Sequence, residues 1–197
     1  PKDLLWDKET GDSWVCLNGC FEILGASVGD KEFCEDYTQG KVEKAAHLLH
    51  QISCIDDPQV ALRLLRNCAG VCKITHNMRM VPTHFHPAAL AEFDKEVQSA
   101  FCKTIGLLPD RDQWQQACRG FKHAGLGLRS ASLHGEAAYL ASACASRDKC
   151  HKLLQTFSLD ADSDASHFGA CLAAYNAKLP PDKQLTPQNV PGRAQKQ

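Results

Sequence analysis

Apolar residues recur with a helical period along most of this chain, and this periodicity constrains its fold more than any other feature. The pattern is clearest at residues 87–105, between a proline that fits a first helical turn and a glycine that ends a helix. Residues 31–53 and 57–80 show it too, and shorter helices are predicted at 110–118, 132–145, 147–157 and 164–178. We therefore expect a mainly α-helical fold.

The N-terminal segment has a strand pattern instead. Short apolar runs at 14–17 and 20–24 lie on either side of Asn18 and Gly19. This dipeptide strongly favours a two-residue hairpin turn. The sequence thus predicts one short β-hairpin ahead of the helices.

These patterns divide the chain into four segments. Residues 1–30 carry the β-hairpin, residues 31–106 form a three-helix bundle, and residues 107–179 form a second helical region that contains the sequence GLGLR. Residues 180–197 are rich in proline and poor in apolar side chains, which predicts an extended tail.

The composition limits the classes of function. Of the 197 residues, 44% are hydrophobic, enough for one sizeable core or for two small ones that share an interface. The net charge is −1 at pH 7, so nucleic-acid binding would depend on a local basic patch. No apolar run approaches the roughly 20 residues of a membrane span, and we expect none.

The start of the chain and its cysteines bear on its processing and on its cellular compartment. The first ten residues lack the apolar centre of a signal peptide, and the missing initiating methionine predicts a fragment or a processed product. The 11 cysteines are an odd number, and most lie on apolar helical faces. Both observations favour free thiols in an intracellular, reducing compartment.

Three groups of cysteine and histidine have spacings that could suit a metal: Cys68, Cys72 and His76; Cys16 and Cys20; His84 and His86. The first group continues the apolar stripe of a helix, so core packing is favoured over zinc binding. The second flanks the expected hairpin turn, where thiols are favoured over a metal or a disulfide. For the third group, capping or solvent exposure is favoured over chelation. We predict no metal and no cofactor.

Two acidic segments resemble catalytic or metal-binding motifs. The run at 160–164 begins like a calcium loop, but Ala165 and Cys171 occupy the places that need glycine and glutamate. Asp56 and Asp57 resemble the paired aspartates of polymerases, yet they run straight into Pro58, which favours a helix cap. No nucleotide-binding, hydrolase or kinase motif is present, so we predict that the chain is not an enzyme.

The glycine-rich segment 123–142 contains Gly125, Gly127 and Gly135, with Arg129 between them. Such a segment can bind phosphate when it joins a strand to a helix and supplies a third glycine or a lysine. Here the preceding residues are a poor strand. Close packing between backbones is therefore the favoured interpretation.

Basic residues are spread over successive predicted helices: Lys41, Lys44, Arg63, Arg66, Lys73, Arg79, Lys122 and Arg129. If they converge, they form a face that could bind a nucleic-acid backbone. Four acidic residues lie among them: Glu35, Asp36, Glu43 and Asp94. A solvated surface of mixed charge is the alternative.

The order of these motifs resembles the reverse transcriptases of non-LTR retrotransposons. The matching segments are FEILGA at 21–26, the helical run at 57–79, then Trp114, Cys118 and Lys122, AGLGLRS at 124–130, and AAYLAS. In that family a hairpin called the primer grip is followed by a helical thumb and a GGLGL segment. Ala124 replaces the first glycine of that segment.

The resemblance implies a thumb-like helical bundle and two sets of contact residues. Phe21, Leu24 and Gly25 match the primer grip, which steers a primer end. Lys41, Lys44, Arg63 and Arg66 fall on the thumb, which follows the template–primer backbone, and Lys73, Arg79 and Arg129 extend the basic set. The catalytic aspartates of the family would precede Pro1 and are not present in this sequence.

Three functional hypotheses remain open. The first is a non-catalytic fragment of a reverse-transcriptase-like protein that contacts an RNA–DNA duplex. The second is a relic of such a protein, reused as a structural or protein-interaction subunit of a larger assembly. The third, an enzyme with a cysteine nucleophile, is weakly supported because no Cys–His pair stands out.

Overall fold

The computed structural model describes residues 4–6, 13–15, 19–156 and 166–190. Two antiparallel strand pairs come first, β1 (Leu4–Trp6) with β2 (Ser13–Val15) and β3 (Phe21–Ile23) with β4 (Ala26–Val28). The α-helices that follow are α1 (Lys31–Ile52), α2 (Pro58–Leu64), α3 (Thr75–Met80), α4 (Pro87–Ile105), α5 (Arg111–Cys118), α6 (Ala131–Leu153) and α7 (His167–Asn176). The predicted mainly helical fold with an N-terminal hairpin is confirmed.

Short helical turns connect these helices. They are the π-helical turn η1 (Leu65–Ala69) and the 3₁₀ turns η2 (Val71–Lys73), η3 (Thr83–Phe85), η4 (Phe121–His123) and η5 (Pro181–Lys183). Two of them carry basic side chains, Lys73 in η2 and Lys122 in η4.

The strand pairing differs from the predicted hairpin. The sequence predicts a turn at residues 18–19, but β3 pairs with β4 through a turn at Leu24 and Gly25, and β2 pairs with β1. Leu24 has φ 50° and Gly25 has φ 79°, the positive values that a type I′ turn requires at both central positions. Ala26 and Ser27 in β4 are buried against α1 and α3, which fixes this register. Asn18 lies outside the described residues.

Local capping signals place most helix ends where the sequence predicts them. The Asp30 carboxylate accepts a hydrogen bond from Phe33 N (2.8 Å) at the start of α1, and Asp57 caps α2 by accepting from Gln59 N (2.8 Å). Asp110 forms a reciprocal capping box with Gln113 on α5. Gly106 ends α4 in the left-handed conformation with φ 69°.

The predicted continuous helix at 57–80 is wrong. It is divided into α2, η1, η2 and α3, with the break at Gly70 (φ −73°, ψ −147°). A Cβ atom at Gly70 would lie 2.9 Å from the Leu65 carbonyl oxygen, so the chain folds back closely on itself there. Both halves still bury apolar side chains in one core, Leu65 and Ala69 before the break and Ile74 and Met78 after it.

The two helices predicted at 132–145 and 147–157 are one helix, α6, which ends at Leu153. Ser146 does not interrupt it, because its hydroxyl donates to the Ser142 and Ala143 carbonyls (both 3.0 Å), one turn earlier. The next predicted helix begins later than expected, at His167, where the Ser166 hydroxyl accepts from Gly169 N (2.9 Å).

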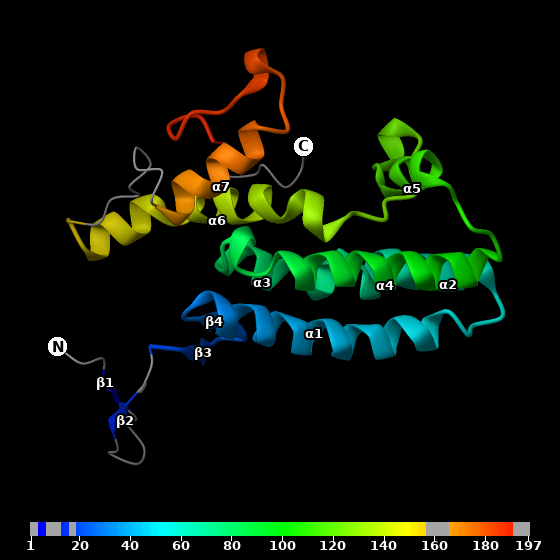
Figure 1. Cartoon of the computed structure of the whole chain (residues 1–197), viewed down its shortest axis with the longest axis horizontal. Helices are drawn as coiled ribbons and strands as arrows, with labels where there is room; N and C mark the ends of the chain where they lie inside the picture. Colours follow the sequence, from blue (N-terminus) through cyan, green and yellow to red (C-terminus); the bar gives the residue numbers. More distant parts are fainter. Residues whose placement is uncertain (1–3, 7–12, 16–18, 157–165, 191–197) are drawn as a thin grey trace.

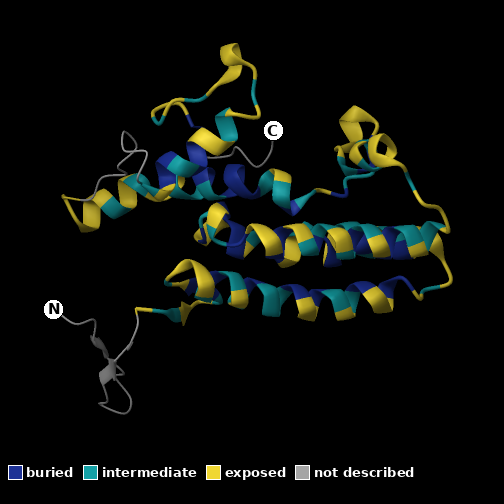
Figure 2. Cartoon of the chain, viewed as in Figure 1, coloured by how far each residue is buried: buried dark blue, intermediate teal, exposed yellow. Residues whose placement is uncertain are grey.

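The main hydrophobic core lies between layers of helices. α2, α3 and α4 form a middle layer, α1 packs along α4 on one side of it, and α6 lies on the other side against α3 and α4 (Figure 1). Buried and exposed residues alternate along each of the long helices (Figure 2). Leu49, Leu65, Ile74, Leu90 and Phe93 are among the fully buried side chains of this core.

A smaller cluster joins α6 to α7 and to the chain that follows. Leu140, Phe168 and Leu172 are buried together, and Val190 from the proline-rich tail joins them. Residues 180–190 are non-helical apart from η5. No helix in the described part of the chain is both long and apolar enough to cross a bilayer.

Candidate nucleic-acid interface

The β3–β4 hairpin presents one exposed apolar side chain at its tip. Leu24 is 91% exposed, while Phe21 in β3 is half-buried. The Leu24 carbonyl oxygen accepts a hydrogen bond from His76 Nε2 (3.1 Å) on α3. The three residues expected to form a primer grip, Phe21, Leu24 and Gly25, therefore lie in one tight hairpin that is tied to a helix.

Three of the predicted basic residues come together beside this helical layer. Lys41 and Lys44 on α1 and Lys73 on η2 line a shallow pocket of about 210 Å³, whose remaining lining is Ala45 and Leu48. Spacings of three and four residues place the α1 members on one face of that helix. Lys73 reaches them because the chain breaks at Gly70, which the sequence pattern does not predict. We call these three residues the lysine cluster.

The charges of the lysine cluster are not neutralised by ion pairs with the described residues. Lys41 Nζ lies 4.9 Å from the centre of the Tyr37 ring, a cation–π contact that leaves its charge in place. Two of the acidic residues expected to dilute the basic face bind backbone amides instead. Glu35 accepts from Ala89 N (2.7 Å), and Asp94 binds the start of α6.

The other predicted basic residues lie elsewhere. Arg66 packs its guanidinium over the Phe121 ring (4.5 Å to the ring centre), and its Nε donates to Asn67 Oδ1 (3.3 Å). This side chain holds the loop after α5 against the core. Arg63 and Arg79 are exposed and do not line the lysine pocket, and Arg129 lines a separate, larger pocket with Lys122.

The glycine-rich segment is a packing element, as the sequence predicts. Gly125 N donates to Gly120 O (3.2 Å), and Gly127 N donates to Arg119 O (2.8 Å). A Cβ atom at Gly125 would overlap the Arg119 carbonyl group, and one at Gly135 would lie 3.0 Å from the Thr83 side chain. The amide groups that a phosphate would need are therefore already used within the loop.

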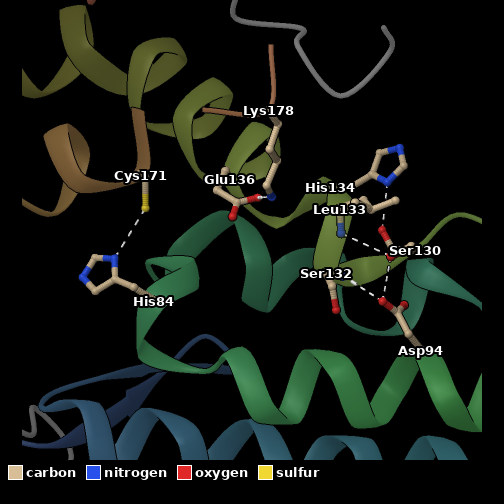
Figure 3. A network of polar contacts seen from close by, with 9 residues as sticks. All are labelled: His84, Asp94, Ser130, Ser132, Leu133, His134, Glu136, Cys171 and Lys178. Carbon is tan, nitrogen blue, oxygen red and sulfur yellow. Dashed lines mark hydrogen bonds and ion pairs between the residues drawn. The ribbon is translucent and has the colours of Figure 1, made fainter. Parts of the chain in front are cut away.

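The first backbone amides of α6 are likewise hydrogen-bonded within the protein. Asp94 on α4 accepts hydrogen bonds from Ala131 N (2.6 Å), Ser132 N (3.0 Å) and the Ser130 hydroxyl (2.7 Å) (Figure 3). A carboxylate thus takes the place that an anionic ligand could take at a helix N-terminus. This contact also ties α6 to α4.

The cysteine predictions are partly wrong. Cys68, Cys72 and His76 are exposed rather than in the core, because the buried side of this segment carries Leu65, Ala69, Ile74 and Met78 instead. Across residues 19–156 and 166–190, no group of three or more His, Cys, Asp or Glu side chains is arranged to hold a metal. The ten cysteines that the structure describes are free thiols. Cys16 and the acidic run at 160–164 lie outside the described residues.

His86 occupies the N-cap position of α4, but its side chain makes no capping hydrogen bond and is buried rather than exposed to solvent. Its Nδ1 atom lies 2.9 Å from the Thr38 hydroxyl on α1, which also accepts from Asn77 Nδ2 (2.6 Å) on α3. Burial lowers the pKa of His86 to about 4, so the ring is neutral at physiological pH. No local sequence signal marks this cluster, since its members are far apart in the chain.

A Cys–His pair that the sequence does not reveal joins α7 to η3. His84 Nδ1 lies 3.7 Å from Cys171 Sγ, and His84 Nε2 lies 3.3 Å from His167 Nδ1 (Figure 3 shows His84 and Cys171). Burial raises the pKa of the Cys171 thiol to about 11, and partial desolvation lowers the pKa of His84. Both groups are therefore neutral, unlike the thiolate–imidazolium pair of a cysteine nucleophile.

The chain matches no protein-family model, and neither a curated protein nor a solved structure is significantly similar to it.

Proposed function

We propose that this chain binds the backbone of a nucleic-acid duplex through the lysine cluster and does not catalyse a reaction itself. The observation that carries the proposal is the convergence of Lys41, Lys44 and Lys73 on one pocket that no carboxylate lines. Lysine ammonium groups bind backbone phosphates as point charges, without reading sequence. A protein with net charge −1 needs such a local concentration of cations to bind a polyanion.

The hairpin tip supports the same function. Leu24 projects from a rigid turn that His76 anchors, as an apolar contact to a primer end would require. The sequence resemblance to reverse transcriptases would make these residues a primer grip, and the segments that carry Lys41 and Lys44 a thumb that follows a duplex. The proposed partner is therefore an RNA–DNA duplex, held by its backbone.

The first test compares two triple variants in a binding assay. We expect the variant Lys41→Gln, Lys44→Gln, Lys73→Gln to bind a labelled RNA–DNA duplex about tenfold more weakly than the natural chain at low salt. The matched control changes three other exposed lysines, Lys149, Lys152 and Lys183, to Gln, so the change in net charge is equal. Equal losses in both variants would show that binding follows net charge and not the lysine cluster.

An apolar groove favours a second candidate, a protein-interaction subunit. Leu107 and Leu108 are 67% and 90% exposed, and they line a groove of about 710 Å³ together with Ile105, Pro109 and Leu126. Exposed apolar surface of this kind is a feature of protein-binding sites. Under this alternative the chain would be a structural part of a larger assembly.

Purification of the chain from its native extract distinguishes the two candidates. Stoichiometric protein partners that survive nuclease treatment, and that are lost in a Leu107→Ser, Leu108→Ser variant, would support the interaction subunit. Loss of all co-purifying material on nuclease treatment would support the nucleic-acid function.

A further inference from the structure

A second basic pocket of the described residues lies away from the lysine cluster. It is formed by α5, η4 and the first turn of α6, and it encloses about 670 Å³. A space of this size accommodates a ligand about as large as one nucleotide. The side chains that define its chemistry are Trp114, Arg119, Lys122, His123, Arg129 and His134.

The pocket lining contains three cationic side chains and no aspartate or glutamate. Arg119, Lys122 and Arg129 are exposed, and none of them forms an ion pair with the described part of the protein. The nearby carboxylate of Asp94 is engaged with the first amides of α6. Burial raises the pKa of the Cys118 thiol to about 11, so it adds no negative charge. The electrostatic character of the pocket is therefore that of an anion site.

Side chains, and not backbone amides, would have to bind the anion. The amides of Gly125, Gly127 and Ala131 all donate within the protein. Two arginines and a lysine remain, and arginine binds phosphate through paired hydrogen bonds. His134 donates from Nδ1 to the Ser130 carbonyl oxygen (2.8 Å), which leaves Nε2 for a ligand.

The pocket also has an aromatic and apolar side. Trp114 is half-buried, and the centre of its ring lies 5.6 Å from that of Phe101, which fixes the indole against the core. Leu133 is 59% exposed at the rim. An indole held in place beside arginines suits a ligand that joins a flat ring to a phosphate.

We infer that this pocket binds one nucleotide unit, with its phosphate at Arg119 and Arg129 and its base against Trp114. The site is distinct from the lysine cluster, because the two pockets share no lining residue. Its proposed ligand is an unpaired nucleotide and not a duplex backbone. Such a unit could come from a free nucleotide or from a single-stranded nucleic acid. The two sources share the chemistry that the pocket recognises.

Calorimetric titration of the full chain tests this inference with defined probes. We expect AMP to bind, and adenosine, ribose 5-phosphate and inorganic phosphate each to bind about tenfold more weakly, since each lacks one part of the ligand. A pentaadenylate strand is the second source. Tighter binding of the strand than of AMP would assign the site to single-stranded nucleic acid, and equal binding would assign it to free nucleotides.

Paired variants locate the site. We expect Arg119→Gln with Arg129→Gln to weaken AMP binding about tenfold or more, while thermal unfolding stays unchanged because these exposed side chains have no partner in the described structure. Lys122→Gln should weaken AMP binding to a smaller degree. The triple variant of the lysine cluster should bind AMP as the natural chain does.

Three outcomes would overturn the inference: no binding of AMP or of the strand, inorganic phosphate binding as tightly as AMP, or unchanged AMP binding in the arginine variant. None of these depends on duplex binding. If the lysine-cluster variant loses the duplex while AMP fails to bind, only the pocket inference fails. If AMP binds while the lysine variant keeps the duplex, only the proposed function fails.

Discussion

At the scale of single residues, glycine positions fix the loop that carries the basic pocket. Gly127 has φ 76°, a conformation that side chains rarely adopt, and its neighbour Gly125 lies directly against the end of α5. Arg66 closes the same loop from the other side through Phe121. Two glycines and one arginine therefore stabilise the observed conformation of this loop.

We expect Gly125→Ala to lower the free energy of unfolding by about 3 kcal/mol, because the added methyl group would overlap backbone atoms of Arg119 and Gln116 that cannot move away. Chemical denaturation measures this change. The matched control is Gly40→Ala in α1, where open space surrounds the added atom and alanine favours the helix by about 1 kcal/mol. Equal effects at the two positions would contradict the packing role of the loop.

At the scale of elements, helix ends follow from the sequence and helix breaks do not. Asp57, Asp110 and Gly106 are caps that act within a few residues, so the sequence predicts them. The break at Gly70, where an added Cβ atom would lie 2.9 Å from the Leu65 carbonyl oxygen, has no such signal, because an isolated glycine is tolerated inside a helix. For this reason the sequence places Lys73 on a continuous helix and does not show that it meets Lys41.

The hairpin turn and the two pockets likewise depend on contacts between residues that are distant in the sequence. The described hairpin turns at residues 24–25 rather than at the predicted 18–19, and burial of Ala26 in the core favours this position. The sequence predicts Arg129 and Lys122 as basic residues of interest but does not identify Arg119 or Trp114 as pocket residues. Their association depends on residues 119–130, which place α5 and the start of α6 around one pocket.

His86, which links the start of α4 to α1 and α3, makes the free energy of unfolding depend on pH. Its folded pKa of about 4 lies below the ordinary value near 6.5, so the unfolded chain binds the proton more readily. The stability is fully present above pH 6.5 and is lost as the pH falls toward 4. From this group alone we expect the free energy of unfolding to drop by about 3 kcal/mol between pH 7 and pH 4.

The measurement is chemical denaturation of the natural chain and of His86→Gln across that pH range. The variant removes the titrating ring, so the difference between the two curves isolates its contribution from that of the carboxylates. Parallel curves, with no steeper loss in the natural chain below pH 6.5, would contradict the buried, neutral state of His86.

At the scale of the whole molecule, a nearly neutral chain separates its charges. Glu35 and Asp94 face inward to cap helices, while the lysine cluster and the pocket at Arg129 present cations on the surface. Net charge alone therefore says little about what this protein can bind. We expect two basic sites with different ligands, a duplex backbone at the lysine cluster and a single nucleotide at the pocket of Arg129.

The central claim is most directly tested by the salt dependence of duplex binding. The logarithm of the association constant should fall linearly with the logarithm of salt concentration. If the lysine cluster makes three phosphate contacts, the slope for the natural chain should be about 2.7 steeper than the slope for the triple lysine variant. The measurement is a filter-binding series with an RNA–DNA duplex at increasing salt. Absence of binding at low salt, or equal slopes for the two proteins, would contradict the account.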